Sequence, residues 1–143
     1  METGTGRVAA LDYGQARIGL AVSDELGLLA HPRPFVPARP LERALRELGA
    51  FFRREGVGHV LLGLPLSLRG SEGTAAGRAR KFGQALASAT GVPIEYVDER
   101  LSTVFASARL REAGHDAKQA RGRIDSASAA LLLQAWLDGR RPT

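Results

Sequence analysis

Three acidic residues stand at the ends of apolar runs, where their charge calls for an explanation. Asp12 follows the short run 8–11, Glu99 comes just after the run 94–97, and Asp125 opens the apolar stretch 124–137. A carboxylate at the mouth of a buried strand costs free energy unless a cation compensates it. Each acid also has an ordinary explanation, because Asp12 could be a hairpin-turn residue and Asp125 a helix N-cap.

If these three acids lie close together, they would repel one another strongly without cations. A divalent metal is the natural counter-charge, and oxygen ligands alone favour Mg²⁺ or Mn²⁺. Cysteine is absent and the three histidines are scattered, which argues against a zinc site of cysteine type or a histidine cluster. Two such ions, roughly 3.5 to 4 Å apart, would stabilise the attacking and leaving oxygens of an in-line displacement at phosphorus.

The elements that must position these acids follow from apolar periodicity and from glycine and proline. Residues 8–11 and 18–22 predict a hairpin, and 28–30 a short third strand before an irregular proline-containing bridge. A helix is expected from Pro40 until Gly56, and a buried strand is expected at 57–64. A loop and a second helix should follow, and the apolar face of that helix runs from Ala75 to Leu86. A strand 94–97, a helix capped by Ser102 or Thr103, a mobile basic loop 114–123 and a helix 124–137 complete the order.

This order predicts an α/β fold with a mixed sheet, in which three antiparallel strands are followed by parallel strands connected through helices. Parallel strands joined by helical crossovers have their carboxyl ends at one edge, where ligand crevices form. Asp12 and Glu99 would therefore face one crevice. Asp125 would join them if the last helix begins over that edge.

The charge balance favours a polyanionic partner without proving one. Twenty basic residues oppose fifteen acidic ones, and eighteen of the twenty are arginine, whose planar fork suits phosphate. An arginine bias also occurs in proteins that bind nothing acidic. The candidate phosphate contacts are Arg17, Arg69, Arg78, Lys81, Arg100, Lys118, Arg121 and Arg123. Of these, Arg17 and Arg100 could equally support the acids as salt-bridge partners.

Length and composition limit the class of protein. The 143 residues suit one domain spanning 1–143, and they are too few for the two lobes of an actin-like ATPase. No apolar run is long enough to span a membrane, and the first residues lack a secretion signal, so a cytoplasmic location is expected. The absence of cysteine excludes disulfides and thiol catalysis.

Several short motifs, in order along nearly the whole chain, make the sequence recognisable. They are Leu11-Asp12-Tyr13-Gly14 with Arg17-Ile18-Gly19, Gly63-Leu64-Pro65-Leu66 with Gly70 and Glu72, Ala79-Arg80-Lys81-Phe82, Asp98-Glu99-Arg100-Leu101-Ser102-Thr103, and Asp125-Ser126-Ala127-Ser128-Ala129. The sequence resembles the YqgF family, also described as Holliday junction resolvase-like, within the ribonuclease H superfamily. Two local features depart from the usual pattern: Gln15-Ala16 replace a frequent Thr-Lys, and Arg69 stands where relatives carry polar or acidic residues.

The resemblance implies a ribonuclease H-like fold with a five-stranded mixed sheet flanked by helices. It also implies Asp12, Glu99 and Asp125 as metal-binding and catalytic acids, and a nuclease role in processing the 5′ end of precursor 16S ribosomal RNA. In that scheme Asp12 would bridge two Mg²⁺ or Mn²⁺ ions, and the other two acids would complete their ligand shells.

Three functional hypotheses remain open at this point. The first is a metal-dependent nuclease acting on RNA. The second is a resolvase of four-way DNA junctions, which requires a homodimer because symmetric cleavage needs two active sites. The third is a non-catalytic RNA-binding protein that uses the same fold as a docking platform. The sequence leaves both a monomer and a homodimer possible.

Overall fold

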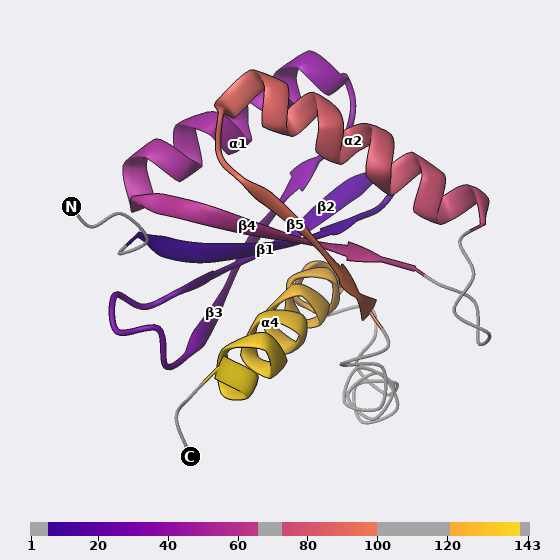
Figure 1. Cartoon of the computed structure of the whole chain (residues 1–143). Coiled ribbons are helices and arrows are strands. Elements are labelled where there is room, and N and C mark those ends of the chain that lie inside the picture. Colours follow the sequence, from indigo (N-terminus) through magenta and orange to yellow (C-terminus); the bar gives the residue numbers. More distant parts are fainter. Residues whose placement is uncertain (1–5, 66–72, 100–120, 141–143) are drawn as a thin grey trace.

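A five-stranded mixed sheet forms the centre of the protein. The structure is a computed structural model that describes residues 6–65, 73–99 and 121–140, with side chains from Ser126 onward in the last segment. Within these residues the strand order is β3-β2-β1-β4-β5 (Figure 1). The strands are β1 Arg7–Tyr13, β2 Arg17–Ser23, β3 Ala30–Pro37, β4 Val57–Leu64 and β5 Ile94–Asp98.

The strand directions agree with the sequence-based prediction. β1 pairs antiparallel with β2, and β2 pairs antiparallel with β3, whereas β1, β4 and β5 are mutually parallel. The carboxyl ends of the three parallel strands therefore lie at the same side of the sheet. We call this side the carboxyl edge and define it by Asp12, Leu64 and Asp98, the residues at or next to those strand ends.

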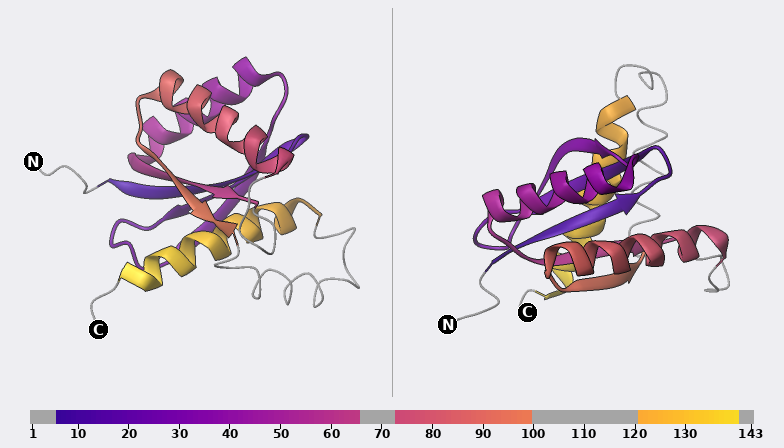
Figure 2. Two further views of the ribbon diagram at one scale, coloured as in Figure 1. Left: turned by 45° about the vertical axis from the view of Figure 1, so that its right-hand side comes forward. Right: turned by 90° about the horizontal axis from the view of Figure 1, so that it is seen from above.

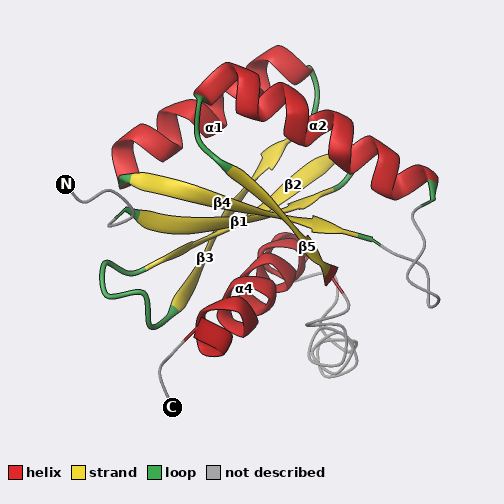
Figure 3. Cartoon of the chain, in the orientation of Figure 1, coloured by secondary structure: helices red, strands yellow, loops and turns green. Residues whose placement is uncertain are grey.

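Helices cover both faces of the sheet (Figures 1 and 2). Helices α1, Leu41–Glu55, and α2, Thr74–Thr90, lie on one face, and α4, Arg121–Arg140, lies on the other (Figure 3). The core accordingly has two parts. Leu48, Phe82 and the strand residues facing them form the first, and Leu133 with the opposite strand residues forms the second. No helix among the described residues is long and apolar enough to cross a membrane.

Local sequence explains the elements around the first core. The apolar stripe of α1 buries Ala44, Leu48 and Phe52, as its helical spacing predicts. The helix ends at Gly56, whose φ of 69° is a left-handed conformation that favours glycine. Strand β4 then begins directly, and its last five residues are buried, as expected for a central strand covered on both faces.

The third strand was predicted too short. It was expected at 28–30, but β3 runs from Ala30 to Pro37 through three prolines. Proline cannot donate a ladder hydrogen bond, which normally argues against a strand. β3 pairs only with β2 and so lies at the edge of the sheet, where a missing N–H on the outer side leaves no neighbouring acceptor unpaired.

The start of the last helix was also predicted too late. α4 begins at Arg121, within the segment 114–123 that was expected to be a loop. Apolar periodicity marks where a helix packs, and the polar sequence at 121–123 has no such periodicity. The remainder of that predicted loop and the predicted helix 102–114 lie outside the described residues. The first helix begins at Leu41, so Pro40 is its N-cap rather than its first residue.

Candidate active site at the carboxyl edge

Asp12 lies near the end of β1, on the face of the sheet that α4 covers. Ala10, two residues earlier, belongs to the core on the α4 side, whereas Ala9 and Leu11 belong to the core on the other side. Because side chains alternate between faces along a strand, Asp12 shares the face of Ala10. Its register partner in β2 is Gly19, so β2 places no side chain opposite this acid.

Glu99 immediately follows β5 and approaches the same face. Val97 packs in the core on the α4 side, and Glu99 is two residues further along. The Glu99 side chain forms a hydrogen bond with that of Asp12. The two sequence-predicted acids at strand ends are therefore in direct contact, although 87 positions separate them in the sequence.

Gly63 of β4 makes this contact possible. In the sheet, β4 stands between β1 and β5, and Gly63 pairs with Val97. A Cβ on Gly63 would lie 2.7 Å from both Cγ and Oε2 of Glu99, closer than real Cβ atoms approach other atoms. The Glu99 side chain therefore lies directly on the Gly63 backbone. Any larger residue at this position would push Glu99 away from its present place beside Asp12.

The electrostatics of this pair disfavour ionisation of both carboxyl groups at once. Burial, followed by the negative charge of Asp12, raises the pKa of Glu99 from 4.5 to about 8. The hydrogen bond with Asp12 and the charge of Asp98 act in the same direction. Two carboxylates this close share one proton in the absence of a cation. A divalent ion between them would favour ionisation of both, so the donor set fits a hard metal.

Helix α4 begins toward the carboxyl edge. The Ser126 hydroxyl donates a hydrogen bond to the backbone carbonyl of Arg33, and Arg33 lies in register with Leu20 and, through it, with Leu11. At the other end of the helix, the Gln134 amide bonds the backbone of Leu28 and Ala30, with distances of 2.9 Å.

Asp125 directly precedes Ser126, so its backbone lies at the end of α4 that points toward Asp12. The position of its side chain is outside the description. Among the residues whose side chains are described, no group of three Asp, Glu, His or Cys forms a metal site. The participation of Asp125 in a triad thus stays a prediction.

Comparison with known proteins identifies the family. Residues 6–139 match the family model RuvX, described as Holliday junction resolvase. A protein of Anaeromyxobacter sp. (strain Fw109-5) is 50% identical over 134 residues, which cover 94% of this chain and 98% of that protein. The chain belongs to the RuvX (YqgF) family. The predicted resemblance is therefore confirmed.

The sequence relatives are named as ribosomal RNA nucleases, and the similar solved structures are named as proteins of Holliday junction resolution. The Anaeromyxobacter protein and a Myxococcus xanthus (strain DK1622) protein, 45% identical over 95% of this chain and 90% of its own length, are both called "Putative pre-16S rRNA nuclease". T. thermophilus RuvC in complex with a Holliday junction substrate aligns with a TM-score of 0.58 at 17% identity, over 94% of this chain and 95% of its own. The fowlpox virus Holliday junction resolvase aligns with a TM-score of 0.53 at 11% identity, over 93% and 98%. These likenesses confirm the predicted ribonuclease H-like fold.

Of the predicted phosphate-contacting residues, the structure describes the side chains of some and not of others. Arg78 and Lys81 lie on α2 and are exposed. The guanidinium of Arg17 lies over the ring of Phe35, 5.1 Å from its centre. Arg69, Arg100 and Lys118 fall outside the described residues, and of Arg121 and Arg123 only the backbone, within α4, is described. None of these placements tests a phosphate contact.

Sequence reasoning did not single out two residues that contact side chains predicted for the site. Gly63 was noted only as part of a motif, although a glycine inside a buried strand is itself a signal of close approach by another group. Gln15 was noted only as a departure from the family pattern. In the structure it contacts Arg78 on α2, and no pattern in the sequence connects positions so far apart.

Proposed function

We propose that this protein is a metal-dependent nuclease that hydrolyses phosphodiester bonds in RNA. The observation that carries the proposal is the contact between the carboxyl groups of Asp12 and Glu99 at the carboxyl edge. Family membership supports it, because proteins up to 50% identical carry a nuclease name. The raised pKa of Glu99 is consistent with this proposal, because a divalent cation bound between the two carboxyl groups would favour ionisation of both.

The residues present fit Mg²⁺ or Mn²⁺. Asp12 and Glu99 offer only carboxylate oxygens, which hard divalent ions prefer. Gly63 leaves the space in which Glu99 reaches across β4. Asp125, at the start of α4, is the third proposed ligand. When bound, two such ions would supply an activated water and stabilise the charge that develops on the phosphate.

The rest of the chain would bind and orient the substrate. α2 begins on the side of the sheet at which β4 ends (Figure 1) and carries the exposed cations Arg78 and Lys81. Contacts of this kind fix the position of a nucleic-acid strand without reading its sequence. Asp12 would hold its metal-binding position because β1 is a central, paired strand whose residues Ala9 to Leu11 are fully buried.

The proposed substrate is precursor 16S ribosomal RNA, as the names of the relatives suggest, and we propose cleavage in its 5′ region, as the family resemblance implies. The test is cleavage of a 5′-extended 16S precursor transcript by wild type and by Asp12→Asn, with Mg²⁺, Mn²⁺ or EDTA. Cleavage should require a divalent ion and fall to background in Asp12→Asn. Asp138→Asn, at the exposed far end of α4, is the matched control and should cleave like wild type.

Two results would contradict this proposal. Equal cleavage by wild type and Asp12→Asn would remove the acid-dependent mechanism. Binding of the transcript by wild type without any cleavage, under all metal conditions, would instead favour a non-catalytic RNA-binding protein.

A second candidate is resolution of four-way DNA junctions, because the matching family model is described as a Holliday junction resolvase. Paired, symmetric nicks require two active sites and hence a dimer. A labelled junction incubated with the protein, together with light scattering at the assay concentration, separates the candidates. Paired nicks by a dimer would favour the junction, whereas a monomer that cleaves only the transcript would reject it.

A further inference from the structure

The tip of the β1–β2 hairpin is held against the first half of α2. Tyr13, the last residue of β1, stacks on Phe82 with ring centres 4.6 Å apart and planes inclined by 22°. Phe82 is buried in the core beneath α2. This stack anchors the turn that follows Asp12 to the helix. We call the line where they meet the hairpin–α2 seam, and it consists of Tyr13, Gln15, Arg78 and Phe82.

On the outer side of this seam, Gln15 holds the guanidinium of Arg78. With its amide oxygen facing α2, Gln15 accepts hydrogen bonds from Nε at 3.0 Å and from Nη1 at 3.2 Å of Arg78. Both residues are exposed. Since a guanidinium carries five N–H donors, this contact orients Arg78 and leaves donors available for another acceptor.

The chemistry of the acceptor matters. An amide oxygen is neutral, so it fixes the direction of the guanidinium without cancelling its charge. A carboxylate at the same place would form an ion pair and reduce the attraction for phosphate. If the role of Arg78 were only structural, a carboxylate could hold its guanidinium as well as the amide oxygen does.

The seam is also free of competing negative charge along its helix. The sequence of α2, Thr74–Thr90, contains no Asp or Glu and carries Arg78, Arg80 and Lys81. Arg80 lies over the ring of Tyr96, 4.8 Å from its centre. Lys81 is exposed and three residues after Arg78, so the two cations are neighbours on the helix surface. Gln15 is three residues after Asp12, in the turn that leaves β1 at the carboxyl edge, so this positive surface lies at the same edge as the proposed active site but on the face that α2 covers.

We propose that Gln15 is a positioning residue that aims Arg78 at a backbone phosphate of the RNA strand bound at the carboxyl edge. The inference rests on the proposed function, since it assigns part of the same substrate's path. It adds a contact, and a residue that orients it, to the site formed by the acids. Loss of the amide should loosen Arg78, and replacement of the amide by a carboxylate should neutralise it.

The test measures binding rather than cleavage. All variants are made in the Asp12→Asn background, and their Kd for a short fluorescein-labelled single-stranded RNA is measured by anisotropy over a salt series in EDTA. Arg78→Ala should weaken binding about two- to fivefold and lower the slope of log Kd against log salt by about 0.7, the loss of one phosphate contact on a single strand.

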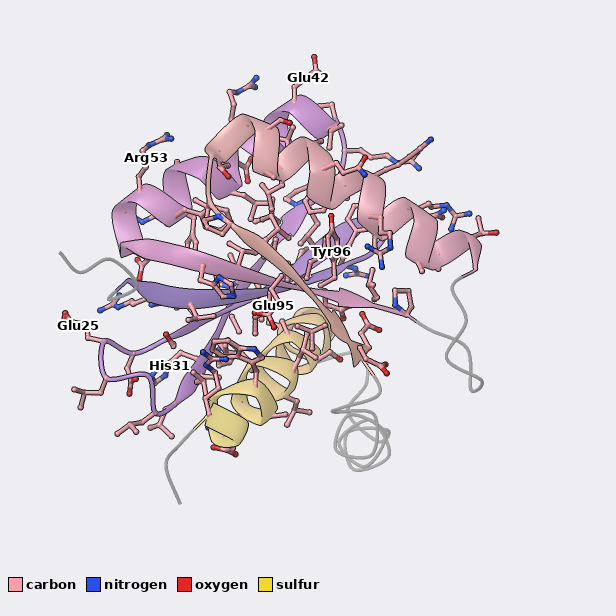
Figure 4. All side chains as sticks on the ribbon, in the orientation of Figure 1. Glu25, His31, Glu42, Arg53, Glu95 and Tyr96 are labelled. Atoms are coloured by element: carbon pink, nitrogen blue, oxygen red, sulfur yellow. The ribbon has the colours of Figure 1, made fainter. Side chains whose placement is uncertain are left out.

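The two Gln15 variants should then differ in a way that a structural role would not produce. Gln15→Glu should reproduce the loss of slope seen in Arg78→Ala. Gln15→Ala should weaken binding with an unchanged slope, because Arg78 keeps its charge and loses its orientation. In the Arg78→Ala background neither Gln15 variant should have a further effect. Arg53→Ala is the matched control, since Arg53 is an exposed cation on α1 well away from the seam (Figure 4).

Three different results would contradict different parts of this proposal. Slopes and affinities equal to those of the Asp12→Asn parent for both Gln15 variants, with weakened binding for Arg78→Ala, would overturn the positioning role of Gln15. An Arg78→Ala protein that binds like the parent and like Arg53→Ala would overturn the phosphate contact itself. If no variant, including the Asp12→Asn parent, binds the RNA, the proposed function fails rather than this inference alone.

Discussion

Replacing Glu99 by Gln should remove a pH-dependent loss of folding free energy that this side chain causes in the wild-type protein. In the folded protein, burial and the charge of Asp12 raise the pKa of Glu99 from 4.5 to about 8. Between these values the folded state binds more protons than the unfolded state, so the free energy of unfolding falls as pH rises. Below 4.5 the side chain is neutral in both states and costs nothing. Above about 8 the cost reaches its full value.

The size of this cost follows from the two pKa values. Their separation corresponds to an upper bound of ~5 kcal/mol. Glu99 is only partly buried, and solvent screening lowers the bound, so we expect about 2 kcal/mol between the two ends of the range. The amide of the Glu99→Gln variant cannot ionise, so this contribution is absent there. The free energy of unfolding of the variant should therefore rise relative to that of wild type as pH rises.

The assay is urea unfolding in EDTA from about pH 5 to about pH 9, a range that spans most of the titration. The difference between Glu99→Gln and wild type should grow by about 2 kcal/mol across this range, whereas for Glu42→Gln it should stay within about 0.5 kcal/mol. Glu42 is an exposed acid on α1, far from β5 (Figure 4). Saturating Mg²⁺ should stabilise wild type more than Glu99→Gln at high pH. Parallel curves for wild type and Glu99→Gln in EDTA would refute the contact with Asp12.

Two further predictions concern packing. Gly63→Ala should lower metal-dependent cleavage by about tenfold or more, because its Cβ would lie 2.7 Å from Glu99. Its circular dichroism spectrum should be unchanged. The matched control is Gly77→Ala, whose Cβ would meet nothing within 4 Å; it should retain activity and gain up to about 1 kcal/mol of stability, since alanine favours the helix. Wild-type cleavage by Gly63→Ala would show that Glu99 is not required where it lies. Leu133→Ala, at a fully buried position on α4, should cost about 2 to 5 kcal/mol in urea unfolding, and a cost below about 1 kcal/mol would show that α4 packs loosely on the sheet.

Patterns of neighbouring residues predicted most of the elements correctly. The continuous apolar run of β4 and the apolar stripe of α1 are consequences of burial, which local spacing reflects directly. Their predicted positions agree with the structure within a residue. β3 and the start of α4 were misjudged for the opposite reason. An edge strand tolerates prolines, and the sequence at the start of α4 is polar and without apolar periodicity, so neither has the expected pattern.

The site shows the same division. Asp12 and Glu99 were found because each ends a strand, and the parallel order of those strands predicted that they face one edge. Gly63 and Gln15 were not recognised as parts of the site. Their importance depends on which side chain lies against them across the sheet or across the hairpin–α2 seam, and that neighbour is distant in sequence.

The sequence by itself determined the fold class, the strand directions and the identity of two acids at strand ends, because these depend on local burial and chain connectivity. Only the tertiary structure decided that Glu99 reaches over Gly63 to Asp12 and that Gln15 holds Arg78. Such contacts depend on distances of a few tenths of an ångström between side chains from different elements. Those distances are set by how the whole sheet and its helices pack, which no short stretch of sequence contains.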